Sequence, residues 1–206
     1  GIPTAVHESN VVPGLTTEML EPFAGRILVG FEACCQHYRH PEKVVVTGTP
    51  VRQDFFDLSK AEAKAKLGVD DGRPLIVSFW GSLGASAMNA RTAELLALEA
   101  KNEPFHHIHG AGRNYSDLLA DLKARGIDRK RYPQIDVREY IYDMPLVMAA
   151  ADLVLCRAGA STIAEITAIA RPAVLVPSPN VVADHQTKNA RVLERAGGAV
   201  LLPESA

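Results

Sequence analysis

Short apolar runs alternate with amphipathic stretches along almost the whole chain. The apolar runs have the length of buried strands, and the amphipathic stretches have the spacing of helices with one apolar face. We predict strands at residues 2–6, 44–46, 75–79, 105–108, 153–155, 173–176 and 199–202. We predict helices at residues 15–20, 59–67, 86–100, 115–125, 143–151, 161–170 and 185–196. This alternation is typical of parallel sheets with helices on both faces, so we expect an α/β protein.

Local signals predict where several helices begin and end. Ser59 and Glu62 have the spacing of a capping box, and so do Thr162 and Glu165. Gly68 follows the first of these two helices, where a residue without a Cβ can end a helix in the left-handed conformation. Two later glycines follow predicted helices in the same way.

The pattern divides into two unequal parts near residues 48–52. Residues 1–51 hold about two strands and one helix, which is too little for a doubly wound domain, whereas residues 52–206 hold about six βα units. The first residue is Gly1 and not Met. We therefore expect a fragment in which residues 1–51 are the C-terminal part of an incomplete N-terminal domain and residues 52–206 form a Rossmann-like domain.

The bulk composition excludes some classes of protein. Apolar residues make up 47% of the chain and charged residues 22%, as in ordinary soluble proteins. The net charge of −2 gives no electrostatic basis for binding nucleic acid. Three cysteines fit neither a disulfide framework nor a zinc site, which suits a reducing cytosol. No apolar segment approaches the roughly 18 residues of a membrane span.

The stretch CRAGASTIAE, residues 156–165, is the most informative in the chain. An apolar strand leads through a small-residue turn into a helix start beside Arg157, which predicts free backbone N–H groups, a positive helix end and a nearby guanidinium. Glu165, one turn into the helix, can accept hydrogen bonds from sugar hydroxyls. The stretch therefore indicates a nucleotide-sugar site. A capped helix, with Glu165 acting only as the cap partner, is the alternative.

A second glycine-containing turn, WGSLGAS at residues 80–86, also follows a predicted strand. Gly81 and Gly84 match only part of a dinucleotide-binding pattern, so a plain βα turn explains the loop equally well. Ligands in open α/β sheets bind at the carboxyl ends of the strands, and two such turns at that edge favour binding.

Three polar clusters have candidate chemistry of their own. In HESNVVPG, residues 7–14, His7 is a possible acid or base and Asn10 is the better binding candidate, because an amide can both donate to and accept from sugar groups. Residues 184–189 open a predicted helix with amides and hydroxyls suited to a uracil or sugar edge. His107 and His109 share one face of a strand, but no carboxylate or cysteine accompanies them at ligand spacing, so we expect no metal there.

Six segments in order resemble the MurG family of N-acetylglucosaminyltransferases, which convert lipid I to lipid II. They are residues 7–16, 44–52, 81–86, 151–166, 172–180 and 185–202. The resemblance implies a GT-B fold of two Rossmann-like domains, a UDP-N-acetylglucosamine donor, a lipid I acceptor and inverting transfer. It also implies a peripheral enzyme on the cytoplasmic face of the membrane. No protein-held metal or other cofactor is expected, and a divalent ion riding on the donor pyrophosphate stays open.

The resemblance also assigns donor contacts by motif position. Those residues are Ser82 on the pyrophosphate, Arg52 at the boundary between domains, Ile141 on uracil through its backbone, Ala160, Ser161 and Thr162 near the diphosphate, Glu165 on the ribose, and Gln186 and Asn10 on the sugar. Arg157 is a further substrate-binding candidate, because its guanidinium is expected beside this helix start. Trp80 stands where the family has a glycine, so we expect its indole either to narrow the donor loop or to pack behind it.

The family's catalytic base lies upstream of residue 1, which leaves His7 as the one candidate base in the chain. We therefore expect these 206 residues to bind the donor and to show little or no transferase activity. Two other functions stay open: a UDP-N-acetylglucosamine 2-epimerase-like isomerase, and a non-catalytic module that binds UDP-sugars.

Overall fold

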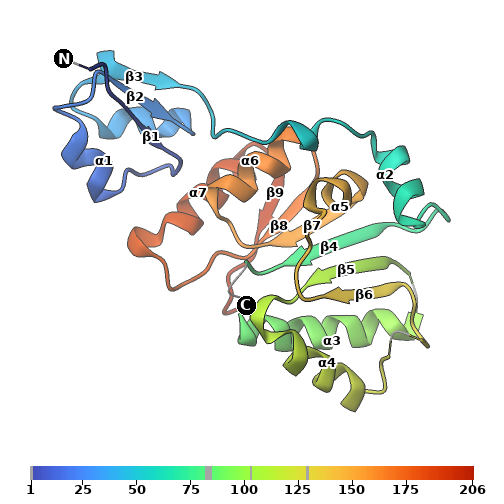
Figure 1. Ribbon diagram of the computed structural model, residues 1–206. Helices are drawn as coiled ribbons and strands as arrows, with labels where there is room; N and C mark the ends of the chain where they lie inside the picture. The colour runs from blue at the N-terminus through green and yellow to red at the C-terminus, as the bar shows by residue number, and fades with distance from the viewer. Residues whose placement is uncertain (1, 82–84, 103, 129) are drawn as a thin grey trace.

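The computed structural model describes residues 2–81, 85–102, 104–128 and 130–206 (Figure 1). Its strands are β1 (Ala5–Glu8), β2 (Arg26–Val29), β3 (Val44–Val46), β4 (Leu75–Phe79), β5 (His106–Gly110), β6 (Ile135–Arg138), β7 (Leu153–Cys156), β8 (Ala173–Leu175) and β9 (Ala199–Leu201). Its α-helices are α1 (Leu15–Leu20), α2 (Lys60–Leu67), α3 (Ser86–Asn102), α4 (Tyr115–Ala124), α5 (Met144–Ala150), α6 (Ala160–Ala168) and α7 (His185–Arg195). Short 3-10 helices are η1 (Glu32–His37), η2 (Pro41–Lys43), η3 (Gln53–Phe55), η4 (Gly112–Asn114) and η5 (Val182–Asp184).

The strands form two separate parallel sheets. Strands β1, β2 and β3 lie side by side in chain order, and the second sheet has the order β6-β5-β4-β7-β8-β9. In the larger sheet, strands are added in one direction from β4 to β6 and in the other direction from β7 to β9. This order is that of a Rossmann fold, with its switch point between β4 and β7. The α/β class predicted from the sequence is confirmed.

Helices cover both faces of the larger sheet (Figure 1). Helices α3 and α4 lie on one face, and α2, α5, α6 and α7 lie on the other. The main core forms where the second group of helices meets β4, β7 and β8, and it includes the buried side chains Val77, Met148, Val154, Ile166 and Leu175. Burial of these apolar surfaces is the main favourable contribution to folding of this unit.

The seven predicted α-helices are all present within about two residues, but two strands were missed. Strand β6 reads IDVR and buries alternate residues at the sheet edge, so it lacks the continuous apolar run of a central strand. Strand β2 is only four residues long. The expectation of about two strands in residues 1–51 is therefore wrong, because three are present.

One predicted capping box is confirmed and the other is wrong. The Ser59 side chain accepts from the Glu62 backbone, and the Glu62 carboxylate accepts from the Ser59 backbone, at the start of α2. Helix α6 instead begins at Ala160, with Gly159 as an N-cap that makes no side-chain cap bond. Thr162 is therefore the third residue of the helix, because the extended backbone of Gly159 starts the helix earlier than the sequence pattern suggests.

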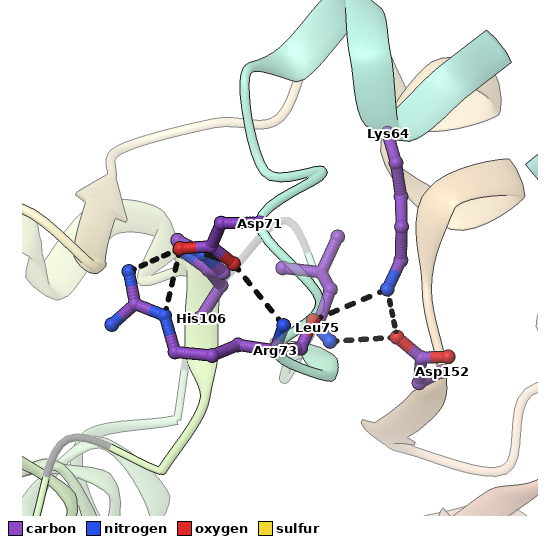
Figure 2. A network of polar contacts seen from close by, with 6 residues as sticks. All are labelled: Lys64, Asp71, Arg73, Leu75, His106 and Asp152. Atoms are coloured by element: carbon purple, nitrogen blue, oxygen red, sulfur yellow. Dashed lines mark hydrogen bonds and ion pairs between the residues drawn. The ribbon is translucent and has the colours of Figure 1, made fainter. Parts of the chain in front are cut away.

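Asp152 ties the amino ends of the central strands to α2 (Figure 2). Its Oδ2 accepts the Leu75 backbone N–H at 2.8 Å and pairs with Lys64 Nζ at 2.6 Å, while Oδ1 pairs with Lys60. Burial acts to raise the pKa of Asp152, but the two lysines and the Leu75 N–H outweigh it and lower the pKa to about 2. These bonds join the amino ends of β4 and β7 to α2. The loops that follow the strands lie at the opposite, carboxyl edge of the sheet.

A second polar network is buried between β4, β5 and α3. Ser78 Oγ lies 2.7 Å from His107 Nε2 and 2.7 Å from His109 Nδ1. His107 Nδ1 lies 2.8 Å from Glu99 Oε2, and His109 Nε2 lies 3.2 Å from Asn89 Oδ1. Ser78 and both histidines are fully buried. The paired histidines of the HHIH segment therefore serve the core, as partners of α3.

The contacts of Asn89, at one end of this network, determine which atom donates in each of its hydrogen bonds. Asn89 Nδ2 donates to the Ala111 carbonyl, which can only accept, so Asn89 offers its oxygen to His109 and Nε2 must carry the proton. Burial, with the nearby His107, lowers the pKa of His109 to about 3, so its Nδ1 is a bare acceptor for the Ser78 hydroxyl. Ser78 Oγ then accepts a hydrogen bond from His107 Nε2. The other ring nitrogen, His107 Nδ1, shares a proton with Glu99 Oε2 in their hydrogen bond.

Replacing Ser78 with alanine leaves one ring nitrogen of each histidine, His107 Nε2 and His109 Nδ1, without its hydrogen-bond partner in the core. We expect Ser78→Ala to lower the free energy of unfolding by about 2 kcal/mol, because unsatisfied buried polar groups keep their full desolvation cost. Urea denaturation at neutral pH measures the change. The matched control is Ser116→Ala at an exposed site on α4, with an expected change of under about 0.5 kcal/mol. Equal stabilities for the two variants would contradict the network.

Candidate functional site

The candidate site lies at the carboxyl edge of the larger sheet. Strand β4 ends at Phe79, before Trp80, and β7 leads into residues 157–159, so the carboxyl ends of these two strands flank the switch point. The loop after β1 approaches the same edge from the smaller sheet, where the Val11 backbone contacts α7. A largely apolar cleft of about 460 Å³ also lies between the two sheets, and Thr49 and Ala160 are among its lining residues.

Within the part of the chain that the structure describes, the first backbone N–H groups of α6 have no hydrogen-bond partner. The first amide with an intrahelical partner is that of Ile163, which donates to the Gly159 carbonyl at 3.0 Å. The amides of Ala160, Ser161 and Thr162 precede it, and no side chain caps this end of the helix. Three N–H groups at the positive end of a helix dipole form an arrangement that can bind a phosphate.

Glu165 lies one turn into α6, near Arg52 of the segment that joins the two sheets. Burial raises the pKa of Glu165, the Arg52 guanidinium acts against that rise, and Asp54 adds to it. Arg52 itself is mostly exposed, with its Nε 3.4 Å from Asp54 Oδ1 and its guanidinium 5.7 Å from the centre of the Phe55 ring. The structure thus brings together Glu165 and Arg52, which are 113 positions apart in the chain.

Gln186 is held by the backbone of two loops at this edge. Its Oε1 accepts the Ser178 N–H at 2.8 Å and the Ala158 N–H at 3.3 Å. The amide nitrogen Nε2 is therefore oriented away from these contacts, with two N–H donors available. A ligand at this position would meet donors and not acceptors, which suits the oxygen atoms of sugar hydroxyls.

Asn10 is oriented by the buried carboxylate of Glu8. Glu8 accepts from the Asn10 backbone at 2.9 Å, from Asn10 Nδ2 at 3.1 Å, from the Gly14 N–H at 2.8 Å and from Thr17 Oγ1 at 2.6 Å. Burial acts to raise the pKa of Glu8, but these bonds outweigh it and lower the pKa. The HESNVVPG loop is thus folded around one carboxylate. His7 and Glu8 point apart, as the sequence predicts for adjacent residues.

Arg157 and Trp80 contact each other and residues next to the candidate site. The Arg157 guanidinium donates to the Val176 and Pro177 carbonyls at 3.1 and 3.2 Å, pairs with Glu204 at 2.6 Å and lies 5.9 Å from the Trp80 ring centre. Trp80 is 5% exposed and donates from Nε1 to Thr92. The indole is thus buried against α3, and its position relative to the donor loop stays a prediction because residues 82–84 lie outside the described residues. Direct contact of Arg157 with a ligand stays a prediction.

The remaining predicted residues have different surroundings. Ile141 lies in the connection after β6, and a Cβ on Gly110 would lie 3.2 Å from its Cδ1, so the glycine makes room for this side chain at the carboxyl edge. His7 Nε2 lies 3.0 Å from the Gly48 carbonyl and so acts as the donor, which leaves Nδ1 as the acceptor for Ser9. Ser82 lies outside the described residues.

Two residues that shape the site were not assigned to it from the sequence. Glu8 and Asn189 entered the sequence analysis only as members of the polar clusters at residues 7–14 and 184–189. Asn189 is fully buried and contacts the loop after β1. The polar character of both segments was visible in the sequence. The contact between Val11 and Asn189, which are 178 positions apart, was not.

No group of three or more histidine, cysteine or acidic side chains placed to hold a metal ion was found among the described residues. Within those same residues, no helix is long and apolar enough to cross a membrane. Cys34, Cys35 and Cys156 are free thiols.

Residues 75–206 match the model of the glycosyltransferase family 28 C-terminal domain. The chain is 41% identical over 203 residues to UDP-N-acetylglucosamine–N-acetylmuramyl-(pentapeptide) pyrophosphoryl-undecaprenol N-acetylglucosamine transferase of Acetivibrio thermocellus, covering 98% of this chain and 54% of the relative. It is 42% identical over 204 residues to the protein of the same name from a Thermoanaerobacter species, covering 99% and 55%. The chain thus spans about half the length of these relatives.

Solved structures show the same architecture. The crystal structure of Acinetobacter baumannii MurG superposes with a TM-score of 0.71 at 28% identity and covers 100% of this chain and 54% of its own. Anabaena HepE, solved with UDP and glucose, superposes with a TM-score of 0.55 at 16% identity over 98% of this chain and 58% of its own, a likeness of fold alone. The fold is therefore that of the GT-B glycosyltransferases, and the match over residues 75–206, more than half of the chain, shows that this chain belongs to the glycosyltransferase family 28 C-terminal domain family.

Proposed function

We propose that this chain is the donor-binding part of a hexosyltransferase that moves N-acetylglucosamine from UDP-N-acetylglucosamine to lipid I, forming lipid II for peptidoglycan. The observation that supports this most is the uncapped first turn of α6, with Glu165 half-buried one turn further on and Arg52 beside it. The names of the relatives at 41 and 42% identity support the same substrate class.

Each part of the donor has a matching chemical environment in this proposal. The diphosphate meets the amides of residues 160–162, the ribose hydroxyls donate to the Glu165 carboxylate, and uracil lies against the backbone at Ile141. The sugar lies between Gln186, which offers N–H donors, and Asn10, whose second amide proton is not used by Glu8. Arg52 adds positive charge at the junction between the two sheets.

The proposed reaction is a single inverting displacement. The C4 hydroxyl oxygen of the muramoyl sugar forms a bond to the anomeric carbon, and the bond from that carbon to the β-phosphate oxygen of UDP breaks. The hydroxyl proton passes to a general base, for which His7 is the candidate within this chain. Negative charge that develops on UDP is stabilised by the helix end and by Arg52. No protein-held metal is required, and a divalent ion can accompany the pyrophosphate.

The acceptor half of the reaction rests on the resemblance and on the names of the relatives. In the proposal, a protein of their length that contains this chain acts at the cytoplasmic face of the membrane as a peripheral enzyme, where lipid I is presented. The 206-residue chain on its own binds the donor and forms little lipid II.

The test of the function uses the 206-residue chain with UDP-N-acetylglucosamine, UDP and ADP in calorimetric titrations. We expect binding of both uridine nucleotides and at least about tenfold weaker binding of ADP, because a buried base edge discriminates by its hydrogen bonds. Donor alone should stay unchanged, and conversion to UDP-N-acetylmannosamine would favour the isomerase. No binding of either uridine nucleotide would contradict the proposal. In a protein of the relatives' length, absence of lipid II from donor and lipid I would overturn the transferase.

Glu165 gives the donor site a pH dependence. The ionised carboxylate accepts from the ribose hydroxyls more strongly than the protonated acid does, so the affinity for UDP is full above the pKa of Glu165 and falls as the pH decreases through it. Because burial raises this pKa above the ordinary 4.5, the loss begins at a higher pH than for an exposed glutamate. Glu165→Gln should weaken UDP binding about tenfold at neutral pH and remove this part of the pH dependence.

Titrations of wild type and Glu165→Gln over the same pH series separate this effect from titration of the UDP phosphate, which both proteins share. Glu94→Gln, at an exposed position on α3, is the matched control and should bind as the wild type does. Parallel pH profiles for wild type and Glu165→Gln would show that Glu165 does not bind the ribose.

A further inference from the structure

Asn189, a buried residue of α7, contacts both the loop after β1 of the smaller sheet and the turn after β7 of the larger sheet. It is not among the proposed donor contacts. Asn189 is 0% exposed. Its Oδ1 accepts the Val11 backbone N–H at 2.9 Å, and its Nδ2 donates to Asn10 Oδ1 at 3.0 Å and reaches the Ala158 carbonyl at 3.5 Å. A single amide thus joins the loop after β1, the turn between β7 and α6, and α7.

The partners fix the orientation of both amides. The Val11 N–H can only donate and the Ala158 carbonyl can only accept, so Asn189 must direct its oxygen to the first and its nitrogen to the second. Asn10 must then present Oδ1 to Asn189, while its Nδ2 faces the Glu8 carboxylate. Both ends of the Asn10 amide are therefore fixed by hydrogen bonds. Rotating this amide by 180° would place its nitrogen against the Asn189 nitrogen and its oxygen against the Glu8 carboxylate.

Asn189 and Gln186 also contact the backbone of the same residue, Ala158. Gln186 accepts the Ala158 N–H, and Asn189 approaches the Ala158 carbonyl, from positions one turn apart on α7. Ala158 lies two residues before the first residue of α6. The polar face of α7 thus fixes the turn that leads into the α6 amides, and the same face binds the loop that presents Asn10.

We propose that Asn189 is a positioning residue that couples the two halves of the donor site. It sets the orientation of Asn10, on the sugar side, from the helix that also supports the diphosphate turn. This inference rests on the proposed function, because it requires Asn10 to contact the donor sugar. Loss of Asn189 would then weaken recognition of the sugar far more than recognition of UDP.

Two substitutions separate positioning from simple packing. Asn189→Ala removes all three bonds. Asn189→Asp keeps an oxygen for the Val11 N–H, but it has no donor for Asn10 or for the Ala158 carbonyl. Arg191→Ala, at an exposed position two residues further along α7, is the matched control. The readouts are hydrogen exchange at the Val11 amide and calorimetric affinities for UDP-N-acetylglucosamine and for UDP.

In both Asn189 variants we expect UDP-N-acetylglucosamine to bind about tenfold more weakly, and UDP to change by less than about threefold. Exchange at Val11 should accelerate in Asn189→Ala and stay slow in Asn189→Asp. In an Asn10→Ala background, Asn189→Asp should cost little further affinity, because the residue it positions is gone. Arg191→Ala should match the wild type in every measurement.

Equal losses for the two nucleotides, or none, in a folded Asn189→Asp protein would overturn the proposal, as would unchanged Val11 exchange in a folded Asn189→Ala protein. If Asn189→Ala does not fold, Asn189→Asp and the Asn10→Ala background decide the question. If the wild type binds neither nucleotide, the proposed function fails and the sugar-positioning role fails with it, whereas Val11 exchange still decides whether the link between the units exists.

Discussion

The parallel order of the larger sheet is the constraint on which the rest of the structure depends. Because β4 and β7 are neighbours and run in the same direction, the chain leaves both strands at one edge and turns to opposite faces of the sheet. Ligands of open α/β sheets bind outside the carboxyl ends of the strands at such a switch point. At the amino edge, Asp152 instead pairs with Lys64 of α2 (Figure 2) and with Lys60 of the same helix. The candidate site therefore lies at the carboxyl edge of the sheet.

Hydrogen-bond direction then determines what the site can offer a ligand. Gln186 uses its oxygen on two backbone amides, which leaves donors, and Asn10 is held between Glu8 and Asn189. Helix α6 begins on a glycine that offers no side-chain cap, so its first amides stay available. Beneath these groups, the Ser78 network fixes α3 against β4 and β5. Groups with fixed orientation lose less entropy on binding than mobile ones.

The sequence predicted those parts of the structure that depend on local pattern. Amphipathic spacing located the α-helices, and the Ser59–Glu62 pair located a helix start, because both signals act within a few residues. The short or alternating strands β2 and β6 were missed, since their assignment depends on neighbours in the sheet. Thr162 and Glu165 matched a capping box by spacing, yet the backbone of Gly159 starts the helix earlier. Glu8 and Asn189 gain their roles through contacts between distant segments that no local pattern encodes.

The central claim is that the open end of α6 and Glu165 form the binding site for a uridine diphosphate sugar. The most direct test is a crystal structure of the chain with UDP-N-acetylglucosamine bound. The account predicts diphosphate oxygens within hydrogen-bonding distance of the amides of residues 160–162, ribose hydroxyls on the Glu165 carboxylate, and the sugar between Gln186 and Asn10. A donor bound elsewhere, with the first turn of α6 facing only solvent, would contradict it.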